Sequence, residues 1–442
     1  MSAAAPSETR SPLSGVEVIY PQYHFYHGFI NEFEKGISHV KESFFVNASG
    51  YKDQSALLQV IVGDHGTQEE LLALPRYQAI MPIWMSTQFG KTLGDVKEGI
   101  ANVIDALKYK ERNRPPIVEK IIAWAPYLEI RGDHDPSNKS RFHVGEALSA
   151  RTLAKLLDNT EGDGVDEMVL LGPHSNEGLQ FLRHKNIKVV PATATPLFAE
   201  HLRDNLIAYE IDKDNLEFVA LDKGSLQQNI KLCQMMDLDP AMHVTAFDKG
   251  RKGENVVDAS NLIYGDPKGK DVVICDDIID TFGSIDATVQ SLRKKFKCKS
   301  VTVMVTHGVL SHPGRANILK ALLETHSVDR VIMTDSLPKA NYDFEKQREK
   351  YPGKLPLIPI AQNLGEMTQY LAEHSYEEIM SDTSPFANFI LEPKNKDDVW
   401  ADFLENTARK DLIVDPKKRE SESRRRKQVV FSQGRHKTLR KY

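Results

Sequence analysis

The chain has 442 residues, of which 40% are hydrophobic and 27% are charged, so it is long enough for two domains with extensions. Its apolar runs and its 8% aromatic content allow ordinary buried cores, which excludes a wholly disordered chain. No apolar run approaches the roughly 18 residues of a membrane-spanning helix, which excludes a span of that kind.

The N-terminal segment and the cysteines further narrow the class of protein and its expected location. Residues 1–14 are rich in Ala, Ser and Pro without the apolar segment of a signal peptide, so we expect a disordered arm there. Cys233, Cys275 and Cys298 are too few for a disulfide framework and too widely spaced for a zinc site. A reducing cytoplasm is therefore the expected location.

Charge is unevenly distributed along the chain. Residues 417–442 contain eleven Lys or Arg and two Glu, so this tail carries +9 and the rest of the chain −14, within a net charge of −5. Such a tail can bind RNA or an acidic partner, or it can remain solvated with no specific ligand. We favour the solvated tail, because Phe431 and Tyr442 are isolated and give no base-stacking pattern. A membrane partner is not expected.

Helical and strand patterns alternate along residues 95–333. Residues 95–110 are predicted to form a helix with an apolar face that includes Ile104 and Leu107, and Pro115 follows its end. Further helices are predicted at 143–157, 195–206 and 285–295. Short apolar strands are predicted at 121–125, 168–171, 189–191, 218–221, 272–275, 301–305 and 331–333. Short buried strands that alternate with helices predict an α/β protein with parallel sheets. After about residue 380 the periodicity fades.

The segment 272–286 contains the strongest functional signal. It reads Val-Val-Ile-Cys-Asp-Asp-Ile-Ile-Asp-Thr-Phe-Gly-Ser-Ile-Asp, a buried strand followed by an acidic pair, a tight loop and a helix start. Ligands of α/β proteins bind at this end of a strand, and backbone N–H groups at a helix start suit a phosphate. Asp276 and Asp277 suit the vicinal hydroxyls of a sugar or a hydrated Mg²⁺. One such Asp could simply cap a helix, but three beside Thr, Gly and Ser favour a binding site.

This segment resembles the ribose-phosphate-binding signature of the phosphoribosyltransferase fold. From about residue 118 to 380, further segments occur in the order typical of ribose-phosphate pyrophosphokinases, also called phosphoribosyl diphosphate (PRPP) synthases. They are the Thr-His-Gly turn within 300–311, the strand end at 334–338, Arg131 with 139–141, and His174 within Leu-Gly-Pro-His-Ser. The chain is thus identified as a divergent member of this family.

The resemblance implies two similar phosphoribosyltransferase-like α/β domains, each a mainly parallel sheet flanked by helices. We expect an ATP-side domain at 15–190 and a ribose-phosphate-side domain at 191–355. Residues 356–382 would return to the first domain, and 383–442 would form a C-terminal extension with the basic tail. A homo-oligomer is also implied.

The implied reaction transfers the diphosphoryl group of ATP to ribose 5-phosphate with Mg²⁺ as cofactor, giving PRPP and AMP. Ribose 5-phosphate would be held by Asp276, Asp277, Asp280, Thr281, Phe282, Gly283 and Ser284. ATP or its diphosphate would be bound by Arg131, His174, Asp222, Lys223 and Gly224, of which His174 and Asp222 would serve the metal. The catalytic cations would be Lys249 and Arg251, in a mobile loop.

Departures from the family pattern keep other functions open. The arginine loop continues as Gly132-Asp133-His134-Asp135-Pro136 where the family usually has Gln and a run of Asp and Lys, and this change favours a non-catalytic subunit. The Phe-x-Asn-x-Glu stretch expected to recognise adenine is not found. Gly172 stands where the family usually has Asp, Ser225 replaces a glycine, and Phe282 replaces a small residue. A non-catalytic regulatory or scaffold subunit and a phosphoribosyltransferase that consumes PRPP are therefore the alternatives. Taken singly, Asp222 would suit a turn cap and His174 a turn.

Overall fold

The structure is a computed structural model. It describes residues 118–128, 149–174, 176–247 and 262–414, the short strands listed below, and helical residues at 101, 104, 105, 107 and 108. Of the predicted helix at 95–110, Ile104 and Leu107 are described, and both are buried as expected. The arm at 1–14, Arg131, Lys249 and the tail at 417–442 lie outside the described residues.

The first of two seven-stranded sheets contains the N-terminal strands in the order β3-β2-β1-β4-β5-β6-β7. All neighbours are parallel except β2 and β3. Its strands are β1 (Val16–Tyr20), β2 (Glu42–Gly50), β3 (Ala56–Ile61), β4 (Tyr77–Pro82), β5 (Val118–Ala125), β6 (Glu167–Leu171) and β7 (Lys188–Ala192). Every described residue of β6 is buried, as expected for a strand covered on both faces.

The second sheet has the order β12-β9-β8-β13-β14-β15-β16, and all of its neighbours are parallel except β9 and β12. Its strands are β8 (Leu216–Ala220), β9 (Val244–Phe247), β12 (Leu262–Tyr264), β13 (Asp271–Ile279), β14 (Ser300–Gly308), β15 (Arg330–Thr334) and β16 (Leu357–Ile358). A separate ribbon pairs β10 (Gly250–Arg251) with β11 (Val257–Asp258). Two mainly parallel sheets confirm the predicted α/β class.

Helices separate most of the strands. They are α4 (Ser149–Leu156), α5 (Asn176–Arg183), α6 (Thr195–Asn205), α7 (Leu226–Met235), α8 (Pro240–His243), α9 (Gly283–Lys294), α10 (Gly314–Leu319), α11 (Pro338–Lys350), α12 (Ala361–Glu373), α13 (Tyr376–Ile379) and α14 (Lys396–Asn406). The predicted helices at 195–206 and 285–295 correspond to α6 and α9. Helix α14 was not predicted, because it lies where the periodicity fades.

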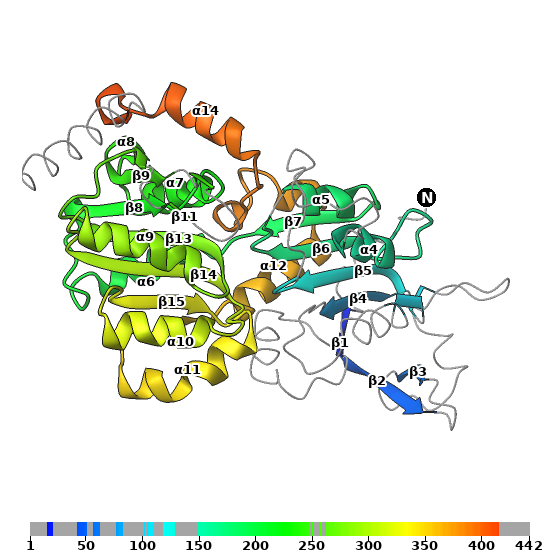
Figure 1. Cartoon of the computed structure of the whole chain (residues 1–442). Helices are drawn as coiled ribbons and strands as arrows, with labels where there is room; N and C mark the ends of the chain where they lie inside the picture. Colours follow the sequence, from blue (N-terminus) through cyan, green and yellow to red (C-terminus); the bar gives the residue numbers. More distant parts are fainter. Residues whose placement is uncertain are drawn as a thin grey trace, which may run out of the picture.

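The second half of the chain contributes to the core of the first sheet. Helix α12 packs on β5 and β6, and its Leu364, Met367 and Leu371 share one buried cluster with Trp124 and Val169 (Figure 1). This packing supports the predicted return of 356–382 to the first domain, although the domain boundaries stay a prediction. No helix in the described part of the chain is long and apolar enough to cross a membrane.

Residues 386–414, called the strap below, run from one sheet to the other (Figure 1). At one end Thr193 N donates to Phe389 O over 2.8 Å and Leu391 N donates to Pro191 O over 3.0 Å, beside β7. At the other end Val414 N donates to Ile263 O over 3.1 Å, beside β12. Helix α14 lies between these two backbone anchors.

Candidate functional site

The predicted site residues gather at the carboxyl ends of β6, β8 and β13, where parallel strands leave room for ligands. His174 follows β6 of the first sheet, Asp222 follows β8, and Asp276 and Asp277 lie in the last part of β13. The candidate site therefore lies where the two sheets meet.

His174 and Asp277 connect the two sheets directly. His174 Nδ1 is hydrogen-bonded to Asp277 Oδ2, between residues 103 apart in the sequence. The negative charge of Asp277 and this hydrogen bond raise the pKa of His174 to about 9, and Asp276 and Asp222 add to the effect. Burial is the largest influence on Asp277 and acts to raise its pKa, but the charge of His174 and the hydrogen bonds to Asp277 together keep that pKa below its ordinary value. Asp276 is oriented by the bond that its Oδ1 accepts from Asp277 N at 3.0 Å.

The loop after β8 is organised by its own carboxylate. Asp222 Oδ1 accepts from Gly224 N at 2.8 Å and from Ser225 N at 3.1 Å, while Ser225 Oγ accepts from Leu221 N at 3.0 Å. Asp222 thus caps this turn, which is the role expected for it when it is considered alone. Its charge also acts on His174, so the two residues belong to one site.

The loop after β13 is braced from outside. Asp280 Oδ1 accepts from Ser311 N at 3.0 Å. Gly314 approaches the backbone so closely that an added Cβ would lie 1.9 Å from Asp280 O, so only glycine fits there. Phe282 has a left-handed φ of 69° at the start of α9, and its side chain is buried in the core of the second sheet. Thr281 and Gly283 are exposed.

Gly172, which stands where the family usually has Asp, is packed closely against His307. Gly172 has a φ of +55°, and a Cβ added to it would lie 2.6 Å from His307 Nε2. His307 is buried, and its Nε2 donates to Leu171 O at 3.2 Å, while its Nδ1 lies 2.9 Å from the Ser336 hydroxyl oxygen. Burial lowers the pKa of His307 to about 4 and keeps its ring neutral. An acidic side chain at 172 is incompatible with this packing.

Asn229, on α7, is a supporting residue that the sequence analysis did not identify. Its Nδ2 donates to Ser225 O and to Cys275 O, each at 2.8 Å, and its Oδ1 accepts from Cys275 N at 3.2 Å. The side chain is fully buried. It fixes the loop after β8 to the strand residue before Asp276. Its spacing of three residues from both Leu226 and Leu232, which places it on the buried face of α7, was the local signal for it.

The remaining predicted residues are only partly described. Lys223 Nζ lies 3.0 Å from Asp397 Oδ1, in the strap. The backbone of Arg251 pairs with that of Val257 in the small ribbon, but its side chain lies outside the described residues, as does that of Ser284. Arg131 and Lys249 are not described at all.

The fit to Mg²⁺ rests on the chemistry of the donors. In the described part of the chain, no group of three or more His, Cys, Asp or Glu side chains is arranged to hold a metal ion. Mg²⁺ in phosphoryl-transfer sites usually keeps several waters and takes one or two carboxylates together with substrate phosphates. Asp222 and Asp276, whose charges both act on His174, can supply such carboxylates. Since Nδ1 of His174 is bonded to Asp277, its Nε2 is oriented as a ligand nitrogen usually is, and it would bind the metal on releasing the proton that the raised pKa keeps on the ring at neutral pH.

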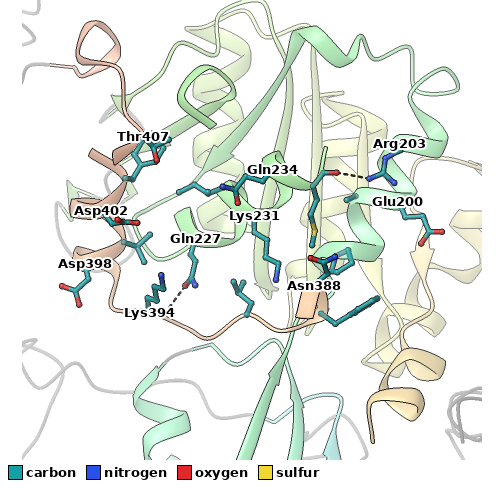
Figure 2. Close-up of a pocket in the computed structure, with 18 residues that line it drawn as sticks. Glu200, Arg203, Gln227, Lys231, Gln234, Asn388, Lys394, Asp398, Asp402 and Thr407 are labelled. Atoms are coloured by element: carbon teal, nitrogen blue, oxygen red, sulfur yellow. Dashed lines mark hydrogen bonds between the residues drawn. The ribbon is translucent and has the colours of Figure 1, made fainter. Parts of the chain in front are cut away.

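A cavity of about 1050 Å³ lies elsewhere, between the strap and helices α6 and α7 (Figure 2). Lys231 points into it and donates to Ile390 O at 2.6 Å, and burial lowers the pKa of its amine to about 8. The residues predicted to bind substrate do not line this cavity.

Comparisons with known proteins agree with this geometry. A family model described as the phosphoribosyl synthetase-associated domain matches residues 255–368. A ribose-phosphate pyrophosphokinase of Corynebacterium glutamicum is 31% identical over 238 residues, which cover 54% of this chain and 64% of that relative. The chloroplastic ribose-phosphate pyrophosphokinase 2 of Arabidopsis thaliana is 28% identical over 266 residues, 60% of this chain and 58% of the relative. The matches thus span less than two thirds of each of these two relatives.

A solved structure shares the fold. The crystal structure of phosphoribosylpyrophosphate synthetase from Mycobacterium smegmatis matches with a TM-score of 0.58 and covers 81% of this chain and 98% of that one. The sequence identity is 20%, so this likeness bears on the fold alone.

Proposed function

Because the chain belongs to the ribose-phosphate pyrophosphokinase (PRPP synthase) family, we propose that it transfers the diphosphoryl group of ATP to ribose 5-phosphate, giving PRPP and AMP. The observation that carries the proposal is the bond between His174 and Asp277. It joins the proposed ATP side and the proposed ribose side in one site.

The loop after β13 would bind ribose 5-phosphate. Asp276 and Asp277 would hold the 2- and 3-hydroxyls as acceptors, since ionised carboxylates can only accept. Backbone N–H groups from Asp280 to the start of α9 would bind the 5-phosphate, with the helix dipole favouring its charge. The brace from Ser311 and Gly314 supports this role, because a rigid loop loses little entropy when it binds.

The loops after β6 and β8 would bind the ATP phosphates. His174, Asp222, Lys223 and Gly224 would lie on this side, with Arg131 at the triphosphate. Mg²⁺, held through His174 and Asp222, would neutralise phosphate charge and orient the transferred group. Lys249 and Arg251 would close over the reacting phosphorus and stabilise the charge of the transition state. The protein's task is then mainly alignment of the sugar hydroxyl with the β-phosphorus.

The wider setting of the proposal is a homo-oligomer in the cytoplasm, with the domains at 15–190 and 191–355 as predicted. A non-catalytic subunit of a PRPP synthase is a second candidate. Gly172 favours it, because the packing of His307 leaves no space for the family's usual carboxylate.

The test is the formation of AMP and PRPP from ATP and Mg²⁺ by the purified chain, with and without ribose 5-phosphate. Both products should appear only with the sugar phosphate, and Asp277→Asn should abolish most of the activity. Asp266→Asn, the same change on an exposed loop, serves as the control. If no AMP forms while ribose 5-phosphate binds in calorimetry, the non-catalytic candidate replaces the synthase.

A further inference from the structure

Lys223, in the proposed diphosphate loop, has its charge paired by the C-terminal extension. Its Nζ lies 3.0 Å from Asp397 Oδ1 and 5.9 Å from the centroid of the Trp400 ring, over that ring. Asp397 and Trp400 are both on α14, whereas Lys223 lies between Asp222 and Gly224, 174 residues earlier in the chain. A lysine expected to meet phosphates is thus bound to a carboxylate.

The contact is the first of a series that joins the strap to α7 and to the turn before it. Lys223 lies in the turn before α7, and Gln227 and Lys231 lie four residues apart on α7, the spacing of one helix face. Gln227 Nε2 donates to Glu392 O at 2.8 Å, and its Oε1 accepts from Lys394 N at 3.1 Å. With the Lys231 bond to Ile390 O, this face of α7 is attached to the strap at Gln227 and Lys231, and Lys223 adds a contact from the turn before the helix.

The series makes the ion pair more ordered than an isolated surface pair. The side chains of Lys223 and Asp397 are 28% and 67% exposed, and a pair of that kind usually gains little because two mobile side chains must be fixed. Here the backbone of the strap is bonded to β7 before α14 and to β12 after it. Asp397 is therefore presented to Lys223 at a fixed place, and part of the ordering cost is met by those bonds.

We propose that Asp397 and Trp400 are positioning residues that hold Lys223 on α14, so that a diphosphate group bound at the Asp222 loop must compete with Asp397 for this lysine. The proposal rests on the proposed function of that loop. The extension then sets the affinity for the phosphate-bearing substrate without contacting it.

Electrostatics sets the direction in which removal of the Asp397 carboxylate changes the affinity for diphosphate. The carboxylate of Asp397 cancels the positive charge of Lys223, and its own negative charge repels a diphosphate. Removing this carboxylate both frees the lysine and removes the repulsion, so diphosphate should bind more tightly. The expected gain is up to about fivefold, the range of an exposed ion pair.

The test titrates inorganic diphosphate with Mg²⁺ into the full-length chain by calorimetry. Asp397→Asn should tighten binding about two- to fivefold, and Asp397→Glu should restore the wild-type value. Asp398→Asn is the matched control, since it makes the same charge change in the same first turn of α14. Lys223→Gln combined with Asp397→Asn should remove the gain. Equal or weaker binding by Asp397→Asn, or no diphosphate binding to wild type and variant alike, overturns the proposal.

A second readout follows Lys223 itself. Diphosphate should change the tryptophan fluorescence of the wild type as Lys223 leaves the Trp400 ring, and Trp400→Phe should lose this change. In the same preparations PRPP formation is assayed independently. A chain that makes PRPP but shows no gain in Asp397→Asn refutes only the positioning role, and one that shows the gain but makes no PRPP refutes only the synthase.

Discussion

Asn229 offers the sharpest test of how the candidate site is held together. The ladder between β8 and β13 ends at the pair Val273 and Phe218, so the next groups of β13 on that side lack a strand partner. The side chain of Asn229 supplies partners to both backbone groups of Cys275 and also to Ser225 O. It therefore replaces the missing ladder and ties two proposed binding loops together.

The cost of removing this side chain can be worked from its bonds. A buried hydrogen bond contributes about 1 kcal/mol net, and orphaned partners add to the loss. Asn229→Ala, which removes three bonds from a fully buried position, should therefore cost about 3 kcal/mol. In a domain of this size that corresponds to a fall in Tm of roughly 6–12 °C.

Asn229→Asp should respond differently because its geometry is nearly unchanged. One carboxyl oxygen can still accept from Cys275 N, but the other faces two carbonyl oxygens and can satisfy one only when protonated. The folded-state pKa of this carboxyl should lie above its ordinary value near 4. Its native contribution is then present at low pH and is lost as the pH rises towards the folded-state pKa.

The assay is thermal unfolding of wild type, Asn229→Ala and Asn229→Asp at several pH values between 5 and 8. The deficit of Asn229→Ala should be independent of pH, and that of Asn229→Asp should grow with pH. Asn205→Ala is the control, because Asn205 makes a single bond to His201 O at 2.8 Å, away from the site. The reasoning is refuted if Asn229→Asp matches the wild type at pH 8 or if Asn229→Ala costs no more than Asn205→Ala.

Local sequence patterns were sufficient to predict the strands and helices that have strong periodicity. The buried strand before Asp276 was predictable because β-branched residues fill it, and the following Gly-Ser marks the start of α9. Helix α14 was missed because charged residues occupy its first turn and only Val399, Trp400 and Phe403 pack inwards. Such a short apolar stripe is weak next to the lysines and aspartates around it.

Contacts between distant segments could not be predicted from local patterns. Only the family resemblance put His174 and Asp277 in one site, and the two side chains are in fact hydrogen-bonded. Asn229 and Asp397 belong to no motif, since their roles depend on which backbone groups and charges the fold brings near them. The roles of Arg131 and Lys249 stay predictions, as both lie outside the described residues.

Three further predictions concern other parts of the molecule. Gly172→Ala should destabilise the chain by about 1–3 kcal/mol more than Gly269→Ala in chemical unfolding, because both glycines have positive φ but only the Cβ at 172 would meet a neighbour, His307. Lys249→Ala should lower kcat much more than it changes ribose 5-phosphate affinity, and an unchanged kcat would remove it from the mechanism. Glu217 is 1% exposed, and burial raises its pKa to about 8. The unfolded chain releases this proton from about pH 4.5 upwards while the folded chain retains it, so wild-type stability should fall between about pH 5 and 8, by roughly 5 kcal/mol at most. Glu217→Gln should remove this loss, and equal pH profiles of the two proteins in urea unfolding would show that Glu217 is not held protonated.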